Sequence, residues 1–401
     1  MILDWLRQLI PQKLINLFWH WPKAFLANIY YCWPAKKLKI IGVTGTDGKT
    51  TTASLIYHLL TQAGLKTGLI STVSVKIGRK EMPTGLHVTS ADPWSLQKFL
   101  RQAVDDGYQY LVLEVTSHGL DQYRFFGVEF EIGVLTNVTH EHLDYHRTYQ
   151  NYLAAKAKLL QKASQSVLNR DDRSFDYLKQ QVMAENKIIT YGKKSGDLNL
   201  KNFSFKTDLL GEYNQLNCLA AAAAAKQMGL KEELIKKGLR SFPGVIGRME
   251  EIKTERGFRV FIDFAHTPNG LEKALQALRS LRPKRLIAVF GAAGLRDKEK
   301  RPMMGQIACR LADKIVLTAE DPRLEKVQEI TKQIAAGCQQ PAKLYREPDR
   351  QQAISLAINH LAKKGDIIGI FGKGHEQSMC FGKEERAWSD HQAAAKALKG
   401  D

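Results

Sequence analysis

The sequence has few cysteines, and their arrangement argues against a Cys-x-x-Cys motif and against a cysteine zinc site. Only five of the 401 residues are cysteine, and none stands in a Cys-x-x-Cys pair or at zinc-site spacing. An odd, scattered set is typical of a reducing cytoplasm, where cysteines act as small apolar residues. We expect that role and a cytoplasmic location for Cys32, Cys218, Cys309, Cys338 and Cys380.

The sequence also has no apolar run long enough to cross a membrane. A spanning helix needs about 20 nearly uninterrupted apolar residues. The most apolar stretch, Leu14–Trp33, is broken by Asn16, His20, Pro22, Lys23 and Asn28. No small-residue cleavage site follows it, which argues against a secretory signal peptide. Solenoid repeats and low-complexity tracts are absent from the sequence as well.

Acidic residues are in short supply relative to basic ones. The chain has 41 Asp and Glu against 59 Lys and Arg, a formal net charge of +18. Such a balance favours anionic partners: nucleotides, nucleic acid or an anionic membrane face. No RNA- or DNA-binding motif is present, so we expect no nucleic-acid partner. The apolar share of 44% and charged share of 25% are ordinary for a soluble globular protein.

Residues 1–38 form an unusual N-terminal arm. Four of the six tryptophans lie there, at Trp5, Trp19, Trp21 and Trp33, among several basic residues. One interpretation is a short helical arm packed on the next domain. The alternative is peripheral membrane contact, because basic, Trp-rich helices anchor well in a membrane interface. The second interpretation would place the protein at the inner face of the membrane.

From Lys39 onward, the chain alternates between buried-strand and helical patterns. Helical periodicity fills the gaps between apolar runs, as in Thr50–Ala63 and Trp94–Asp105, and the alanine-rich Asn217–Gly229 predicts a closely packed helix. The predicted strands are Leu38–Val43, Gly68–Val75, Tyr110–Val115, Ile132–Thr136, Phe258–Phe264, Arg285–Phe290, Lys314–Thr318 and Asp366–Phe371. This alternation is typical of an α/β protein with mostly parallel sheets.

A Pro- and Gly-rich break at Ser241–Gly247 divides the alternating part. We therefore predict three segments. The arm of residues 1–38 precedes a central nucleotide-binding domain of residues 39–243. A C-terminal, Rossmann-like α/β domain of residues 244–401 follows.

The strongest local signal is a phosphate-binding loop. The strand Ile40–Val43 leads into a turn of Gly45, Thr46, Asp47 and Gly48, and Lys49, Thr50 and Thr51 then open a helix. Backbone N–H groups of such a turn, with the helix N-terminus, cradle phosphate oxygens. Lys49 would neutralise β- and γ-phosphate charge, and the Thr50 hydroxyl would bind Mg²⁺. The spacing departs from the GxxxxGK[ST] pattern because Gly42 lies one residue too far upstream.

Ordered motifs then extend from this loop to the end of the chain. They read "GTDGKTTT", "LEVTSHGLDQYR", "TNVTHEHLDYH", "YLAAKAKLL", "GEYNQLNCLAA", "GRMEEI", "DFAHTPNGL", "RDKEKRPMMG", "EDPR" and "GKGHE". In content and order they resemble the motifs of the Mur ligase family, closest to its MurE type, the UDP-N-acetylmuramoyl-tripeptide synthetases. The resemblance covers the chain from about Lys39 to its end.

The resemblance implies Mg²⁺-dependent ATP chemistry. Thr50, Glu114, His142 and Lys156 match the metal-binding positions, where oxygen and imidazole ligands suit a hard cation. Lys156 also matches a lysine that is carbamylated in the family, which turns an ammonium into a carboxylate-like ligand.

Further positions match nucleotide and catalytic residues of the family. Asn214 and Asn217 match nucleotide contacts, with Asn217 favoured for adenine; helix capping is their alternative role. Arg248 and Asp263 would reach the phosphate and ribose of ATP, and His266 would assist. A guanidinium there stabilises charge that grows during phosphoryl transfer.

The reaction implied is amide formation through an acyl phosphate in peptidoglycan precursor synthesis. The acceptor would be UDP-MurNAc-L-Ala-D-Glu, and the catalytic residues would be Lys49, Lys156, Arg248 and His266. The predicted acceptor contacts are Thr89, Ser90, Ser117 and Arg124. We expect a monomer with small-molecule substrates.

The "EDPR" segment bears on which amino acid is added. Family members that use meso-diaminopimelate carry DNPR there, so Arg323 is retained while Asp321 replaces Asn. Arg323 can bind a distal carboxylate in bidentate fashion. Glu376 would bind the distal ammonium and Arg296 another carboxylate. This set favours meso-diaminopimelate over lysine, although the extra charge of Asp321 would also suit a different diamino acid.

Two departures from the family keep other functions open. Only about 38 residues precede the central domain. This is too few for the family's usual N-terminal domain, which binds the UDP part of the acceptor. A lipid-linked acceptor would fit the arm. The segment directly before "RDK", Gly291–Leu295, contains fewer glycines than the same segment in the family. The alternatives are a folylpolyglutamate-synthetase-like ligase and a non-catalytic nucleotide-binding protein.

Overall fold

The computed structural model describes residues 11–78, 80–83, 91–139, 141, 143–183 and 185–400. These residues form two compact units. The first comprises Met1–His140, His146–Thr207 and Gln215–Phe242, and the second comprises Glu141–Tyr145, Asp208–Asn214 and Pro243–Asp401. The predicted division at residues 38 and 243 remains our proposal for the domain boundaries.

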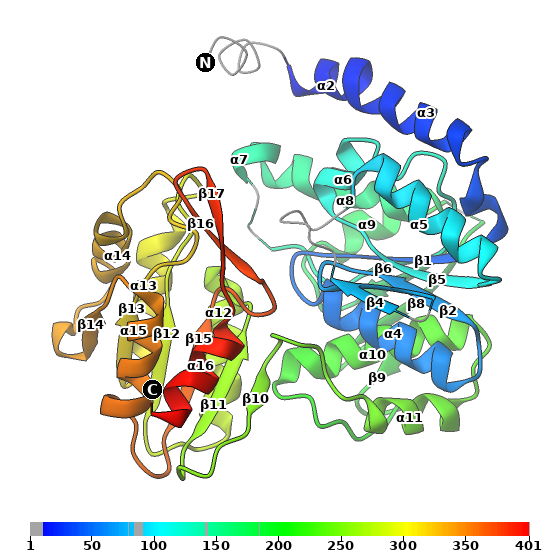
Figure 1. Cartoon of the computed structure of the whole chain (residues 1–401). Coiled ribbons are helices and arrows are strands. Elements are labelled where there is room, and N and C mark those ends of the chain that lie inside the picture. Colours follow the sequence, from blue (N-terminus) through cyan, green and yellow to red (C-terminus); the bar gives the residue numbers. More distant parts are fainter. Residues whose placement is uncertain are drawn as a thin grey trace. The chain divides into compact units, whose positions relative to one another are not determined.

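A nine-stranded sheet forms the centre of the first unit, counted within the described residues (Figure 1). Its order is β4-β3-β2-β5-β1-β6-β7-β8-β9, and every pair from β2 to β9 is parallel. The strands are β1 (Lys39–Thr44), β2 (Thr67–Ile70), β3 (Ser74–Ile77), β4 (Lys80–Pro83), β5 (Tyr110–Glu114), β6 (Phe130–Leu135), β7 (Ala163–Asn169), β8 (Lys187–Gly192) and β9 (Leu198–Asn199). The predicted mostly parallel α/β class is confirmed for this unit.

One predicted strand is wrong in its extent. The apolar run Gly68–Val75 forms two antiparallel strands, β2 and β3, joined by a turn. Ser71 closes that turn, because its backbone N–H and its hydroxyl both donate to the carbonyl of Ser74 at 3.0 and 3.1 Å. Hydrophobicity continues through the turn and therefore hides it.

Helices flank the sheet of the first unit. They are α2 (Gln12–Ile15), η1 (Asn16–His20), α3 (Trp21–Tyr30), η2 (Pro34–Lys37), α4 (Lys49–Gln62), α5 (Pro93–Asp105), α6 (Ser117–Asp121), α8 (Tyr149–Gln161), α9 (Phe175–Gln180) and α11 (Glu232–Ser241). The helices α7 (Leu143–His146) and α10 (Glu212–Gln227) contain residues assigned to both units. All six alanines from Ala220 to Ala225 in α10 are fully buried, which confirms the close packing expected of this helix.

A six-stranded sheet of order β10-β11-β15-β12-β13-β14 organises the described part of the second unit. All neighbours except β10 and β11 are parallel. The strands, with a separate hairpin, are β10 (Glu250–Ile252), β11 (Arg259–Asp263), β12 (Leu286–Phe290), β13 (Lys314–Leu317), β14 (Leu344–Arg346), β15 (Ile367–Phe371), β16 (Ser378–Phe381) and β17 (Glu384–Ala387). The helices are α12 (Pro268–Ser280), α13 (Lys300–Leu311), α14 (Val327–Ala335), η3 (Pro341–Lys343), α15 (Arg350–Ser355), η4 (Leu356–Leu361) and α16 (Asp390–Lys399). The predicted second α/β sheet is therefore present.

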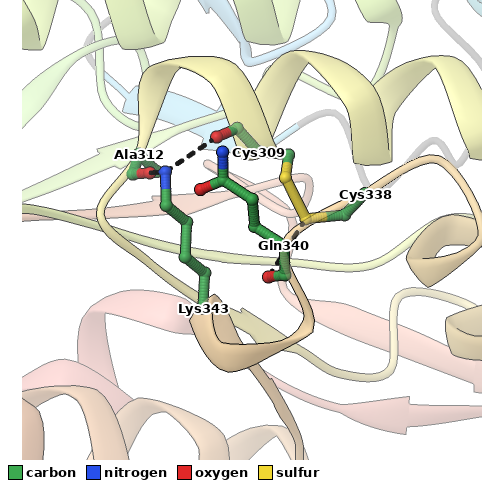
Figure 2. The surroundings of a disulfide bond; sticks show 5 residues. All are labelled: Cys309, Ala312, Cys338, Gln340 and Lys343. Atoms are coloured by element: carbon green, nitrogen blue, oxygen red, sulfur yellow. Dashed lines mark hydrogen bonds between the residues drawn. A yellow bond between two sulfur atoms is a disulfide. The ribbon is translucent and has the colours of Figure 1, made fainter.

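Two cysteines of this unit do not have the expected role of small apolar residues. Cys309, near the end of α13, and Cys338, just after α14, form a disulfide (Figure 2). Their Cα atoms are 5.3 Å apart, a separation that a disulfide can span. Sequence spacing gave no signal for this pair because the fold, and not the local chain, brings the ends of α13 and α14 together.

The N-terminal arm is helical and packs on the first unit. Ala24 and Ala27 of α3 are fully buried, so the described part of the arm packs on the first unit, as the first of the two interpretations expects. Across the described residues, from Pro11 to Gly400 with short gaps, no helix combines the length and the hydrophobicity that a membrane crossing requires.

Candidate functional site

The phosphate loop begins at the carboxyl end of the central strand β1. Two neighbouring strands, β5 and β6, end beside it, so residues after all three strands gather at one sheet edge. Gly48 precedes α4 with φ of 80°, a left-handed conformation that glycine adopts without strain. A Cβ at Gly45 would collide with Thr136, and one at Gly48 would collide with Asn217. The turn is therefore shaped by close approach and requires glycine at both positions.

Lys49 and Thr50, the first residues of α4, take up positions suited to phosphate and metal. The Lys49 ammonium donates to the Thr46 carbonyl at 2.8 Å and so lies over the loop. The Thr50 hydroxyl lies 3.1 and 3.0 Å from the two carboxylate oxygens of Glu114. Glu114 ends β5, is 2% exposed, and also accepts from the backbone N–H of Thr72 at 2.9 Å. Thr51 is buried one residue further along α4.

Thr136 and Asn137, which follow β6, hold the loop from its other side. The Asn137 side chain accepts from the Asp47 N–H at 3.0 Å and donates to the Asp47 carbonyl at 3.1 Å. Thr136 donates to the same carbonyl at 2.7 Å. Both residues stand in the "TNVT" motif, but the motif alone assigned them no role. Their contacts identify them as positioning residues for the loop.

Lys156 lies beneath the same loop. Its ammonium donates to the Gly45 carbonyl at 2.6 Å, lies 4.5 Å from the Tyr152 ring centroid, and is almost completely buried. Tyr152 in turn lies 3.1 Å from the Thr46 hydroxyl. The "YLAAK" segment therefore reaches the loop through both its tyrosine and its lysine. Thr50, Glu114 and Lys156, three of the four predicted metal ligands, all contact the phosphate loop or its helix.

Ser117, a predicted acceptor contact, pairs with a residue that sequence reasoning did not single out. Its hydroxyl lies 3.0 Å from Nε2 of His146, the last residue of the "HLDYH" segment. Burial, with the neighbouring His118, lowers the pKa of His146 to about 4, so the imidazole is neutral at neutral pH. Arg124 has its guanidinium against the Gln122 side chain at 2.7 and 3.0 Å.

The two asparagines of the α10 segment make different contacts. Asn217 accepts from the Thr52 hydroxyl at 3.4 Å and lies against Gly48, as expected of a residue near bound nucleotide. Asn214 donates to the Leu210 carbonyl at 2.7 Å, which ties the start of the helix to the preceding loop.

In the second unit, Asp263 organises the "GRME" and "DFAHTP" segments. Its carboxylate accepts from the backbone N–H groups of Met249 at 2.7 Å and Ala265 at 2.8 Å. The Arg248 guanidinium lies over the Phe264 ring at 4.4 Å, a cation–π contact. His266 packs on the edge of the same ring, and its Nδ1 lies 2.9 Å from the Phe264 carbonyl.

His375, in the "GKGHE" segment, also contacts the Phe264 ring, with the ring centroids 5.1 Å apart and the ring planes tilted by 50°. Burial, followed by the charges of Arg248 and Lys373, lowers its pKa to about 3. A Cβ at Gly247 would collide with the His375 backbone. The glycines of the two motifs therefore let their loops pack backbone against backbone.

The "EDPR" and "GKGHE" segments meet through a lysine that sequence reasoning did not select. Lys373 is 1% exposed, and its ammonium lies 2.8 Å from Oδ1 of Asp321 and forms a second ion pair with Glu376. Asp321 and Arg323 have φ of 42° and 52°, an uncommon conformation for non-glycine residues that is typical of functional loops. Within the described residues, no hydrogen bond or ion pair engages the Arg323 guanidinium. Arg296 lies on the neighbouring loop and is exposed.

Glu320, the first residue of "EDPR", is a buried carboxyl group. Its Oε2 atom has no hydrogen-bond partner in the described structure. Burial raises the pKa of Glu320 to about 7, although Lys300, Arg350 and Lys373 oppose the shift. A carboxyl group titrating near neutral pH next to the predicted amino-acid contacts was not expected from the sequence.

Three predicted site residues, Thr89, Ser90 and His142, lie outside the described residues. The described part of the chain contains no group of three or more His, Cys, Asp and Glu side chains placed to hold a metal. A magnesium ion nonetheless fits the donors present, because Glu114 and Thr50 supply hard oxygen ligands beside a phosphate-binding turn. The remaining ligands would be phosphate and water oxygens.

Comparison with known proteins agrees with this geometry. Residues 43–225 match the Mur ligase middle domain, and residues 247–374 match the Mur ligase glutamate ligase domain. The chain is 40% identical over 399 residues to the UDP-N-acetylmuramoyl-L-alanyl-D-glutamate–2,6-diaminopimelate ligase of Thermosynechococcus vestitus, covering 93% of this chain and 79% of that protein.

Solved structures support the same relationship. A structure of a UDP-N-acetylmuramoyl-L-alanyl-D-glutamate–2,6-diaminopimelate ligase is 31% identical with a TM-score of 0.62, covering 90% of this chain and 78% of that one. The folylpolyglutamate synthase of Mycobacterium tuberculosis shares the fold, with a TM-score of 0.70 at 17% identity and coverage of 88% and 91%. The family matches and the identity over most of the chain lead to one conclusion: this protein belongs to the Mur ligase family of ATP-dependent, amide-bond-forming ligases.

Proposed function

We propose that this chain adds 2,6-diaminopimelate to UDP-N-acetylmuramoyl-L-alanyl-D-glutamate in peptidoglycan precursor synthesis. The observation that carries the proposal is that one chain contains both a phosphate loop, in the first unit, and a buried charged cluster at "EDPR" and "GKGHE", in the second. The activity for which relatives at about 40% identity are named supports the same substrates.

In the first step, a carboxylate oxygen of the acceptor attacks the γ-phosphorus of ATP, and ADP leaves. Lys49, at the loop, would neutralise charge on the β- and γ-phosphates. Thr50 and Glu114 are the proposed ligands of a magnesium ion, which would supply further neutralisation of phosphate charge. In the second unit, Arg248 would stabilise transferring phosphate, Asp263 would hold its loop, and His266 would assist.

In the second step, the free amine of diaminopimelate attacks the acyl carbon. The tetrahedral intermediate loses a proton and expels inorganic phosphate, leaving the amide. Fixing amine and acyl phosphate together removes most of the entropic cost of their encounter. Arg323 would hold the distal carboxylate, Glu376 the distal ammonium and Arg296 another carboxylate. Ser117 and Arg124 are the proposed acceptor contacts, together with Thr89 and Ser90.

We also propose that Lys156 is carbamylated in the active enzyme. Its nitrogen is buried at the Gly45 carbonyl, where a charged ammonium gains little from solvent. Addition of carbon dioxide to the neutral amine, with loss of a proton, would place an anionic oxygen ligand near the metal. Lys156→Ala should lose activity and regain part of it with a small added carboxylate such as formate. Failure of every small carboxylate to restore turnover would argue against the carbamate.

The reaction itself is tested by phosphate release from ATP and Mg²⁺ in the presence of UDP-N-acetylmuramoyl-L-alanyl-D-glutamate. Meso-diaminopimelate, L-lysine or no amino acid would be supplied in parallel. Release that requires both the acceptor and diaminopimelate is the expected result. Release with lysine alone would overturn the assignment of the amino acid, and no release with either amine would overturn the assignment of the acceptor.

We propose that the protein acts in the cytoplasm as a monomer, on small-molecule substrates and without a nucleic-acid partner. Residues 1–38 would bring it to the inner face of the membrane.

A further inference from the structure

One face of the N-terminal arm, defined here as α2, η1 and α3 (residues 12–30), is fixed to the first unit. The Asn28 side chain donates to the Phe126 carbonyl at 2.9 Å. The Asn16 side chain donates to the Asp121 carboxylate at 2.8 Å. Both asparagines are buried, and their polar bonds fix the rotation of the helices about their axis.

An aromatic cluster secures the same face of the arm. Trp21 stacks on Phe25 with ring centroids 5.4 Å apart, and both rings contact Phe126 at 5.8 and 6.2 Å. Trp33, just beyond the arm, closes the cluster at 6.1 Å from Phe126. The arm is therefore a docked element with a defined outer face.

That outer face is apolar. Phe18 is 72% exposed and Trp19 is 66% exposed, although both are large hydrophobic side chains. The described residues expose fifteen large hydrophobic side chains, and seven belong to this short arm: Leu14, Leu17, Phe18, Trp19, Leu26, Ile29 and Tyr30. Such a concentration is unusual for a surface that only water contacts. These side chains are spread along the arm, from Leu14 in α2 through Phe18 in η1 to Leu26 in α3.

Charge around this face has a single sign. Residues 11–38 contain no Asp or Glu. Lys13, Lys23, Lys36 and Lys37 are exposed, and Lys36 lies 5.4 Å from the centroid of the Trp33 ring. Outside the arm, Asp92 forms an ion pair with Lys23, with Nζ and Oδ1 3.9 Å apart. The arm therefore combines exposed apolar and aromatic side chains with flanking lysines. This combination complements a surface with an apolar interior and anionic groups at its boundary with water.

We propose that the exposed face of the arm docks on an anionic lipid bilayer, with the helices lying in the interface plane. Phe18, Trp19 and Leu26 enter the boundary between headgroups and acyl chains. The lysines extend their apolar stems along it and bring their ammonium groups to lipid phosphates. The proposal does not depend on which amino acid the ligase adds, and it goes beyond the proposed reaction by naming the surface and the lipid chemistry it binds.

The test is vesicle flotation of the full-length protein, with phosphatidylglycerol–phosphatidylcholine vesicles and with phosphatidylcholine vesicles alone. We expect binding to the anionic vesicles that weakens as salt rises. The triple variant Phe18→Ser, Trp19→Ser and Leu26→Ser should bind more than about tenfold more weakly. Lys13→Gln and Lys37→Gln should each weaken binding roughly fivefold. Leu234→Ser, at a similarly exposed leucine on α11, is the matched control and should bind like the wild type.

Circular dichroism and ATP turnover of each variant show whether the fold is intact, so loss of vesicle binding is not confused with unfolding. Equal binding to both vesicle types, or unchanged binding by a folded triple variant, would overturn the proposal. Light scattering without lipid provides a further outcome. A dimer in the wild type that the triple variant converts to monomer would show that the face pairs with a second copy, and would also overturn it.

Discussion

The Lys373 ammonium lies 2.8 Å from Oδ1 of Asp321. Asp321 stands where family members that use diaminopimelate carry Asn, and its extra charge had left the identity of the amino acid open. Buried Lys373 offsets that charge and also pairs with Glu376. Asp321 also accepts from the Cys380 N–H at 2.9 Å, which ties the loop to the β16–β17 hairpin.

Asp321→Asn should weaken binding of the amino acid with little change in the chemical step. Without the aspartate charge, Lys373 would pair with Glu376 alone and hold it away from a substrate ammonium. We expect the KM for diaminopimelate to rise about tenfold, the effect of losing one charge-assisted contact, while kcat changes little. Steady-state kinetics with saturating ATP and acceptor measures both constants.

Leu324→Ala, at an exposed neighbour on the same loop, is the control for general disturbance of the segment. An equal change in KM for both variants, or a fall in kcat alone for Asp321→Asn, would contradict this role for Asp321.

Lys49→Ala should abolish most turnover without unfolding the protein. The Lys49 side chain is at the surface of the loop, bonded to the Thr46 carbonyl, and the core beneath α4 does not depend on it. Loss of a preorganised cation at transferring phosphate typically lowers kcat by about 10²- to 10³-fold. Phosphate-release assays beside thermal unfolding curves separate the two effects. Near-normal turnover in the variant would remove Lys49 from the mechanism.

The sequence predicted the α/β class and the edge at which the phosphate loop lies, because both depend on local patterns. Strand β1, the glycine turn and α4 are contiguous, and buried parallel strands read as apolar runs. Strands β7 and β8 were not predicted, because segments such as Ala163–Asn169 mix polar residues into partly exposed strands.

The parts of the site that depend on tertiary contacts could not be predicted in this way. Lys373 reads as a solvated charge in the sequence, and only the fold buries it between two carboxylates. The bond between Ser117 and His146, 29 residues apart, likewise depends on how α6 and α7 approach each other. The roles of the individual site residues therefore remain predictions that substitution must test.

Glu320→Gln should raise the free energy of unfolding relative to the wild type by more at pH 8 than at pH 5. In the folded protein, burial raises the pKa of this carboxyl from 4.5 to about 7, so the folded state retains a proton that the unfolded state releases. Stability from this group therefore falls as pH rises between 4.5 and about 7, by on the order of 3 kcal/mol in total. Glutamine mimics the protonated form and removes the decline.

Urea unfolding of both proteins at pH 5 and pH 8 gives the comparison. Glu255→Gln, at an exposed glutamate, controls for the loss of one surface charge. The same difference between variant and wild type at both pH values would show that Glu320 does not titrate in this range.

Breaking the Cys309–Cys338 disulfide should destabilise the second unit. The bond closes a loop across a sequence separation of 29 residues, which corresponds to about 3–4 kcal/mol of unfolded-state entropy. The same corner is held by Lys343, whose ammonium donates to the Cys309 carbonyl at 3.1 Å and the Ala312 carbonyl at 3.3 Å (Figure 2). These hydrogen bonds should hold η3, which follows α14 and Cys338, at the end of α13 after the disulfide is lost, so the variant should fold.

Cys338→Ala should therefore unfold at lower urea, and a reductant should lower the stability of the wild type but not of this variant. Cys32→Ala, at an exposed free cysteine, is the matched control and should respond to reductant as the wild type does. Thiol titration in denaturant, without reductant, checks the premise directly. Three reactive thiols per chain are expected from Cys32, Cys218 and Cys380. If all five cysteines reacted, the pair would be reduced in solution, and the expected effect of Cys338→Ala would shrink to that of removing a buried thiol.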